Sequence, residues 1–253
     1  MAYKIAVDAG HGGEDPGAVY QGRREKDDTL RLALAVGEIL ENSGADVIYT
    51  RTEDVYQTPF QKAQIANSEG ADFFVSLHRN SSPVPNQYSG VETLVFDKAG
   101  KKLEMAENIG EETEEAGFKD LGVKERPGLV VLRRTRMPAV LVEAGFINSD
   151  QDNRLFDERF EDLAQGIADG VLETLDQTEA EEQKYYRVQT GAFAVRQNAE
   201  RMLQELQEAG YPAFLLAEDG YYKVQVGAYR YLNNAVTMER RLRRDGYSTM
   251  ITV

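Results

Sequence analysis

Residues 3–13 read Tyr-Lys-Ile-Ala-Val-Asp-Ala-Gly-His-Gly-Gly, and this stretch indicates how the chain folds. Residues 3–7 form a short apolar run typical of a buried strand. The strand leads into a loop of small residues that carries His11, where flanking glycines let a ligand approach closely. Such a histidine can offer a ring nitrogen to a metal or a proton, although a histidine at a strand end is more often a hydrogen-bonded structural residue.

Strand-like and helix-like patterns alternate over roughly the first 175 residues, as is typical of α/β folds. The chain is therefore expected to form a mostly parallel sheet flanked by helices, with ligands beyond the carboxyl ends of its strands. His11, His78 and Glu143 each follow such an end, so the fold should bring them together. The further expected strands are residues 46–50, 73–77, 91–96, 130–132 and 139–142, and the helices are 29–43 (capped by Asp28), 58–69, 101–117 and 156–175.

Composition excludes several classes of protein. The 253 residues carry a net charge of -14, which argues against a nucleic-acid binder, and the absence of cysteine excludes disulfides and thiolate zinc sites. No run is apolar and long enough to span a membrane, so no membrane anchor is expected. With a strand from residue 3 there is no space for a signal peptide, which predicts synthesis in the cytoplasm.

The composition changes near residue 176. Residues 176–184, Asp-Gln-Thr-Glu-Ala-Glu-Glu-Gln-Lys, are polar and acidic, and we interpret them as a linker between domains at 1–175 and 185–253; they could instead extend the preceding helix. Beyond them the sequence repeats itself. The Tyr-Tyr-Arg-Val-Gln run from Tyr185 matches the Tyr-Tyr-Lys-Val-Gln run from Tyr221, and each copy has a strand, helix, strand pattern. Two copies predict one small α+β domain, βαββαβ, with both helices on one face of a four-stranded sheet.

Three residues of the first domain suit a catalytic zinc site. His11 and His78 are the only two histidines of the chain, and Glu25 lies in a polar segment before the first helix. Two histidines and a glutamate are a known catalytic zinc set that leaves a position for water. No His-Glu-x-x-His helix is present. The plainer alternative is a buried histidine pair and a surface glutamate.

Glu143 follows the expected strand 139–142, where a buried carboxylate is costly unless it is paired or used. As a general base it could take a proton from the attacking water and pass it to a leaving amine. The alternative is a salt bridge to Arg133 or Arg134.

These residues fall in a family pattern. The first domain, residues 3 to about 175, resembles zinc-dependent N-acetylmuramoyl-L-alanine amidases of the Amidase_3 type. The resemblance implies Zn2+ ligands at His11, Glu25 and His78, a catalytic Glu143, and hydrolysis of the amide between the lactyl group of N-acetylmuramic acid and L-alanine in peptidoglycan. The chain departs from the pattern at Arg79, where a small residue is common, and at 148–150. The matching stretches are 8–18, 25–27, 51–52, 76–80, 90–92, 131–133 and 137–146.

The repeat domain resembles a SPOR domain, which implies binding to denuded glycan strands, those stripped of stem peptides. Gln189 and Gln225 could offer polar groups to sugars from its open sheet face. Residues 185–253 carry nine Lys plus Arg against seven Asp plus Glu, and no aromatic signature of an RNA-binding module is present, so nucleic acid is not an expected partner.

Two other functions fit the first domain less well. An inactivated amidase that only attaches to the wall would be expected to lack a ligand or Glu143, whereas a zinc peptidase that cuts cross-links is not excluded by the metal set. We expect an enzyme that reaches the cell wall after lysis or release, at the end of sporulation or in phage lysis.

Overall fold

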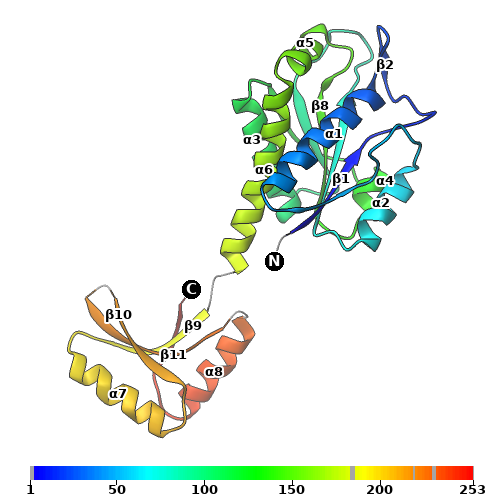
Figure 1. Cartoon of the computed structure of the whole chain (residues 1–253). Helices are drawn as coiled ribbons and strands as arrows, with labels where there is room; N and C mark the ends of the chain where they lie inside the picture. Colours follow the sequence, from blue (N-terminus) through cyan, green and yellow to red (C-terminus); the bar gives the residue numbers. More distant parts are fainter. Residues whose placement is uncertain (1–2, 183–185, 219, 230–231, 253) are drawn as a thin grey trace. The chain divides into compact units, whose positions relative to one another are not determined.

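The computed structural model describes residues 3–182, 186–218, 220–229 and 232–252. The chain divides into two compact units, Met1–Asp176 and Gln177–Val253 (Figure 1). The first unit confirms the expected α/β class, and the second is a small α+β unit.

A six-stranded sheet forms the centre of the first unit, in the order β4-β1-β5-β8-β6-β7. Strands β4, β1, β5 and β8 run parallel to one another, whereas β6 is antiparallel to β8 and parallel to β7. The mostly parallel sheet is thus confirmed. A short hairpin joins β1 to the first helix. The strands are β1 Lys4–Ala9, β4 Asp46–Tyr49, β5 Phe73–Asn80, β6 Val91–Val95, β7 Asp120–Glu125 and β8 Ala139–Phe146, and the hairpin is β2 Val19–Tyr20 with β3 Arg23–Arg24.

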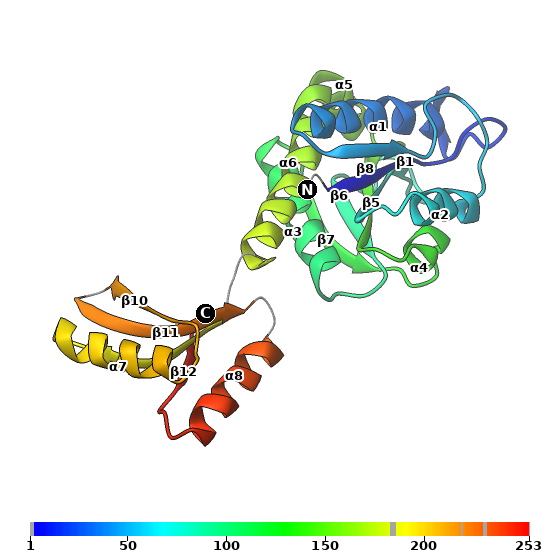
Figure 2. The same ribbon diagram turned by 60° about the horizontal axis from the view of Figure 1, so that its bottom comes forward.

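Helices cover both faces of this sheet (Figures 1 and 2). One face packs the larger core, in which strand residues such as Val75 and Val142 meet α1, α3, α5 and α6. The other face packs a smaller core against α2 and α4, with Phe74 and Leu141 in its centre. The helices are α1 Glu25–Asn42, α2 Pro59–Ser68, α3 Lys101–Glu115, α4 Val130–Arg134, α5 Asp150–Glu158 and α6 Phe160–Glu182.

Three expectations for the first unit are wrong. Residues 130–132 form part of helix α4, because a short apolar run suits a buried helix as well as a strand. Strand β7 was not expected, since its glycine and charged residues hide the alternation of Leu121 and Val123. The single helix expected at 156–175 is two helices, α5 and α6.

Two helix boundaries also differ from expectation. Helix α1 begins at Glu25, so this residue lies in the first helical turn and not in a preceding loop, and Asp28 is inside the helix. Acidic residues in the first turn favour this earlier start because they complement the helix dipole. Helix α6 continues to Glu182, so most of the segment 176–184 extends the preceding helix and does not form a linker. Residues 183–184 lie outside the described residues.

The second unit has the predicted topology, with a four-stranded antiparallel sheet in the order β10-β11-β9-β12. Its helices share one core with the sheet, centred on Val188, Val224 and Leu206. The two copies of the repeat meet at the centre, where Gln189 of β9 pairs with Gln225 of β11. The elements are β9 Tyr186–Phe193, α7 Arg196–Glu208, β10 Ala213–Glu218, β11 Tyr221–Tyr229, α8 Leu232–Arg244 and β12 Met250–Thr252.

Gln189 and Gln225 are far less accessible than expected. Their exposed fractions are 8% and 2%. A hollow on this sheet is lined by Arg187 and Phe214 beside Gln225, so exposed groups other than the two glutamines dominate it. In the described part of the chain, no helix combines the length and apolar character needed to cross a membrane.

Candidate functional site

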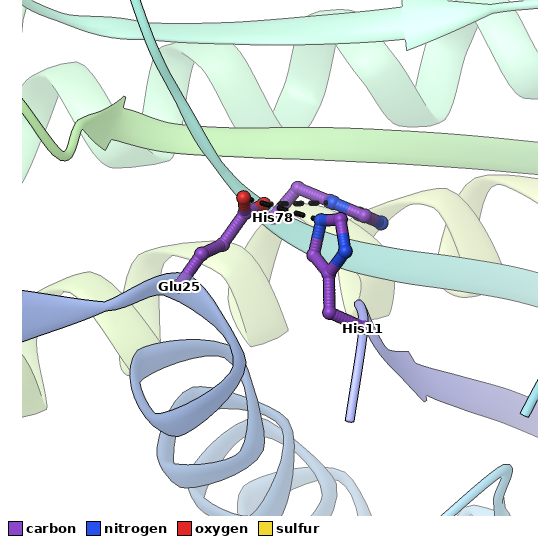
Figure 3. A group of neighbouring side chains, drawn as sticks. All are labelled: His11, Glu25 and His78. Carbon is purple, nitrogen blue, oxygen red and sulfur yellow. Dashed lines mark hydrogen bonds and ion pairs between the residues drawn. The ribbon is translucent and has the colours of Figure 1, made fainter. Parts of the chain in front are cut away.

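The fold brings His11, Glu25 and His78 together from three separate elements (Figure 3). Glu25 Oε2 lies 3.1 Å from His11 Nε2, and Glu25 Oε1 lies 2.9 Å from His78 Nδ1. The two imidazole rings are 4.9 Å apart and nearly perpendicular. One ligand atom from each residue lies within 4.8 Å of the others, so the three form a candidate metal site.

Close backbone packing holds the two histidines in place. His11 has a φ of 59°, which a loop rich in glycine accommodates. A side chain at Gly17, with φ 64°, would place its Cβ 2.6 Å from both Glu25 Oε2 and His11 Cδ2, and one at Gly10 would collide with the His78 ring. The absence of a side chain at Gly10 and Gly17 therefore leaves the space that the two histidines and Glu25 occupy.

Glu25 is fixed and kept ionised by its surroundings. It is 4% exposed, and its carboxylate accepts backbone hydrogen bonds from Ala18 and Arg79 at 2.9 and 3.0 Å. Burial raises the pKa of this carboxyl, but hydrogen bonds from His11 and His78 outweigh burial and lower it below its usual range. A buried carboxylate between two imidazoles is suited to a cation.

Asp15 is a member of the site that the sequence analysis missed. Its Oδ2 lies 2.8 Å from His11 Nδ1, which directs His11 Nε2 toward Glu25. Burial lowers the pKa of His11, but the Glu25 and Asp15 carboxylates outweigh burial and raise it to about 9 in the metal-free protein. A carboxylate four residues after a candidate ligand, in the same loop, was the available signal, since metal-binding histidines usually donate their other N–H to such a group.

Glu143 lies beside this cluster, within β8 and not at its end. It pairs in register with His78 of β5 on one side and with Glu92 of β6 on the other. Its Oε2 is buried and has no hydrogen-bond partner. Burial, with the Glu25 and Glu92 carboxylates adding to it, raises the pKa of Glu143 to about 7. No ion pair joins Glu143 to Arg133 or Arg134, so the structural alternative for Glu143 is not observed in the described residues.

The carboxylate of Glu92, next to Glu143 on the paired strand, has a partner for each oxygen. It accepts a hydrogen bond from Asn80 Nδ2 at 2.7 Å and forms an ion pair with Lys124. The lysine compensates the charge of Glu92, which leaves Glu143 as the carboxylate of this strand pair that is free to exchange a proton.

A buried hydrogen-bond network around Asp8 supports the loop that carries His11. Asp8 accepts hydrogen bonds from Thr50 and Ser76 and pairs with Lys62 Nζ at 3.0 Å. Burial raises the pKa of Asp8, but Lys62 and the two hydroxyls outweigh burial and lower it. Lys62 also donates to the carbonyl of Ala9, so this network ties helix α2 to the loop that carries His11.

Arg79, the departure from the family pattern, has a structural place. Its side chain is buried, stacks over Phe156 at 4.2 Å, and pairs with Asp28. Burial lowers its pKa to about 10. The arginine points away from the histidines into the contact with α5, so the departure leaves the site intact.

Comparison with known proteins identifies the family of each unit. A family model described as N-acetylmuramoyl-L-alanine amidase matches residues 5–173, and a SPOR domain model matches residues 182–252. The sporulation-specific N-acetylmuramoyl-L-alanine amidase of Bacillus subtilis (strain 168) is 35% identical over 222 residues, 85% of each chain. The endolysin of Bacillus phage SPP1 is 36% identical over 70% of this chain and 67% of its own.

Solved structures give the same assignment. The crystal structure of N-acetylmuramoyl-L-alanine amidase from Clostridium difficile 630 superposes with a TM-score of 0.65 at 34% identity, over 69% of this chain and 97% of that one. The resemblance found in the sequence is confirmed. The chain belongs to the N-acetylmuramoyl-L-alanine amidase family and carries a SPOR domain.

Proposed function

We propose that this peptidoglycan amidase is zinc-dependent, with the ion held by His11, Glu25 and His78 and with Glu143 as general base. The observation that carries the proposal is the convergence of three ligand atoms within 4.8 Å, next to a buried carboxylate oxygen without a partner. The donor set of two imidazoles and one carboxylate fits zinc and leaves a position for water or substrate.

The residues around the ion have distinct tasks. Zinc bound there would supply a Lewis acid that polarises the amide carbonyl and activates water. Glu143 Oε2 accepts a proton from the attacking water and then donates it to the nitrogen of L-alanine as the amide bond breaks. The products are a lactyl carboxylate and a stem peptide with a free amino group. A pKa near 7 suits a group that must first accept a proton and then release it.

We propose that the SPOR domain binds denuded glycan strands and keeps the enzyme on the wall. The family match over residues 182–252 supports this role, and no histidine occurs in that part of the sequence for a second catalytic centre. The names of the relatives, a sporulation-specific amidase and an endolysin, support a role in wall lysis. We propose that the protein is synthesised in the cytoplasm and reaches the wall after lysis or release.

Metal content and product analysis test the proposal together. We expect one zinc per chain in the wild type, and loss of both zinc and activity in His78→Ala and Glu25→Gln. Glu14→Gln is the matched control, because Glu14 is an exposed carboxylate in the His11 loop and is not part of the cluster. Digested wall should show new L-alanine amino groups and no new reducing ends. Full activity of a metal-free His78→Ala protein would contradict the zinc site.

A further inference from the structure

A hollow of ≈ 840 Å³ lies between helices α2 and α4, outside the site described above. Three arginines form one side of it, and side-chain amides of α2 form the other. No Asp or Glu is among the residues that line it. The residues that matter here are Arg133, Arg134 and Arg136 on one side and Gln61, Gln64 and Asn67 on the other.

The charges of these arginines are not neutralised by the protein. Arg133, Arg134 and Arg136 are exposed, and within the described ranges no Asp or Glu lies within ion-pair distance of any of them. The chain as a whole has a net charge of -14, with 43 acidic against 29 basic residues. Three unpaired arginines in one concave place therefore create a local positive field on an otherwise acidic protein.

The backbone that carries the arginines is fixed. Asn67 of α2 donates from Nδ2 to the Arg134 carbonyl at 2.8 Å and accepts at Oδ1 from the Arg136 backbone N–H at 2.9 Å. Thr135 Oγ1 donates to the Val131 carbonyl at 2.7 Å. A basic segment held by side-chain hydrogen bonds on both sides is preorganised, which reduces the entropy lost when a ligand binds.

The hollow runs along a helix that begins beside the catalytic loop. Lys62 Nζ, in the first turns of α2, lies 3.4 Å from the His11 carbonyl. The ten residues of α2 rise by about 15 Å in all. An extended peptide covers about 3.3 Å per residue, so four or five residues that leave the catalytic site along α2 would reach the arginines.

We propose that this hollow binds the carboxylates of the stem peptide, a short acidic peptide that begins at the L-alanine released by the enzyme. The proposal rests on the amide cleavage described above, because that reaction places the first peptide residue at His11 and Glu143. Guanidinium groups match carboxylates in charge and planar geometry, and the amides of Gln61 and Gln64 are suited to hydrogen bonds with peptide groups. The enzyme would therefore select substrates by the charge of the stem.

The test uses the full chain and a synthetic stem peptide that begins with free L-alanine, in one form with free carboxylates and in one form with amidated carboxylates. Because this peptide is a reaction product, its binding does not depend on turnover. We expect calorimetry to show tighter binding of the acidic form by wild type. The double variant R134Q/R136Q should bind the acidic form about threefold to tenfold more weakly and the amidated form unchanged. R154Q, at an exposed arginine of α5, is the control and should match wild type.

Steady-state kinetics on muramoyl peptides with the same two stems complete the test. R134Q/R136Q should raise KM for the acidic stem with little change in kcat. Equal affinity of wild type for both peptide forms, or equal weakening of both forms in R134Q/R136Q, would overturn the proposal even if the enzyme hydrolyses both muramoyl peptides. Selective binding of the acidic peptide, with no hydrolysis of either muramoyl peptide, would support the peptide-binding role of the hollow and contradict the proposed catalytic site.

Discussion

The two units of this chain bury different kinds of polar residue. The first unit buries charged groups below 6% exposure, among them Asp8, Glu25, Lys62 and Arg79. The described part of the second unit buries only uncharged polar residues, Gln189, Thr190 and Gln225. A buried charge reduces stability unless it is paired or used. In the first unit Asp8 pairs with Lys62, Arg79 pairs with Asp28, and Glu25 lies between two histidines. The described part of the second unit has no buried charge that needs such a partner.

Glu143 provides the strongest test of this difference, because its Oε2 is buried without a hydrogen-bond partner and no ion pair of the described residues compensates its charge. We expect Glu143→Gln to fold and retain zinc but to lose activity by about a hundred- to ten-thousand-fold, the usual contribution of a general acid–base group. Wall digestion and zinc analysis of the same protein measure both properties. Activity within twofold of wild type would show that Glu143 has only a structural role.

Asp15 should have a smaller effect that acts through the metal. Asp15→Asn removes the charge that orients and polarises His11, so we expect zinc affinity to fall about ten- to a hundred-fold. Competition with a chelator measures the affinity, and activity should return when zinc is in excess. Glu14→Gln, the neighbouring exposed carboxylate, should leave zinc affinity unchanged; an equal loss in both variants would indicate a general charge effect of the loop.

The pKa of Glu143 predicts a stability cost that depends on pH. In the metal-free protein its pKa is raised from 4.5 to about 7, so the folded state favours the protonated carboxyl. This favourable contribution is complete below about pH 4.5 and is lost as pH rises through 7. Metal-free Glu143→Gln should therefore be more stable than wild type by about 1 to 3 kcal/mol at pH 8 and similar to it near pH 4.5.

Urea unfolding followed by circular dichroism at the two pH values checks this expectation. Glu14→Gln is again the control, because its exposed carboxylate should give no difference at either pH. A stability gap between Glu143→Gln and wild type that does not change with pH would mean that packing, and not ionisation, separates the two proteins.

The sequence predicted which residues cluster at the candidate site better than it predicted the contacts around them. His11 and His78 stood out as the only histidines, each after an apolar run, Glu143 stood out in the same way, and Glu25 stood out in a polar segment before the first helix. The family pattern then implied the roles of ligand and base. The side-chain contacts could not be predicted, since Glu92 lies beside Glu143 only through the pairing of β6 with β8, and Lys124 reaches Glu92 only through the pairing of β6 with β7. A strand that reverses direction in a mostly parallel sheet leaves no local signal.

The errors in predicting the fold also come from contacts between segments that are distant in the sequence. The run at 130–132 carries two β-branched residues, yet it packs as α4 because Val131 and Leu132 meet the small core beside α2. Strand β7 has only intermediate burial and exposed charges, so its pairing with β6 and not its composition makes it a strand. In both cases tertiary contacts override local preference.

The smallest expected effect concerns the separation of the two units. A chain that ends after Glu182 keeps α6 intact together with the cluster of His11, Glu25 and His78. We expect its kcat/KM on small soluble muramoyl peptides to stay within twofold of the full chain. On insoluble sacculi it should be slower by a few-fold, because a bound SPOR domain raises the local concentration of enzyme at the wall without any new contact at the active site.

Binding assays show whether the lost rate comes from tethering. Residues 185–253 should sediment with amidase-treated wall better than with untreated wall, because treatment exposes glycan without stem peptides. With nine basic and seven acidic residues in this range, binding should weaken little at moderate salt. If the shortened chain loses activity equally on soluble and insoluble substrates, the second unit contributes to catalysis itself. The contrast between a reactive unit and a binding unit would then be wrong.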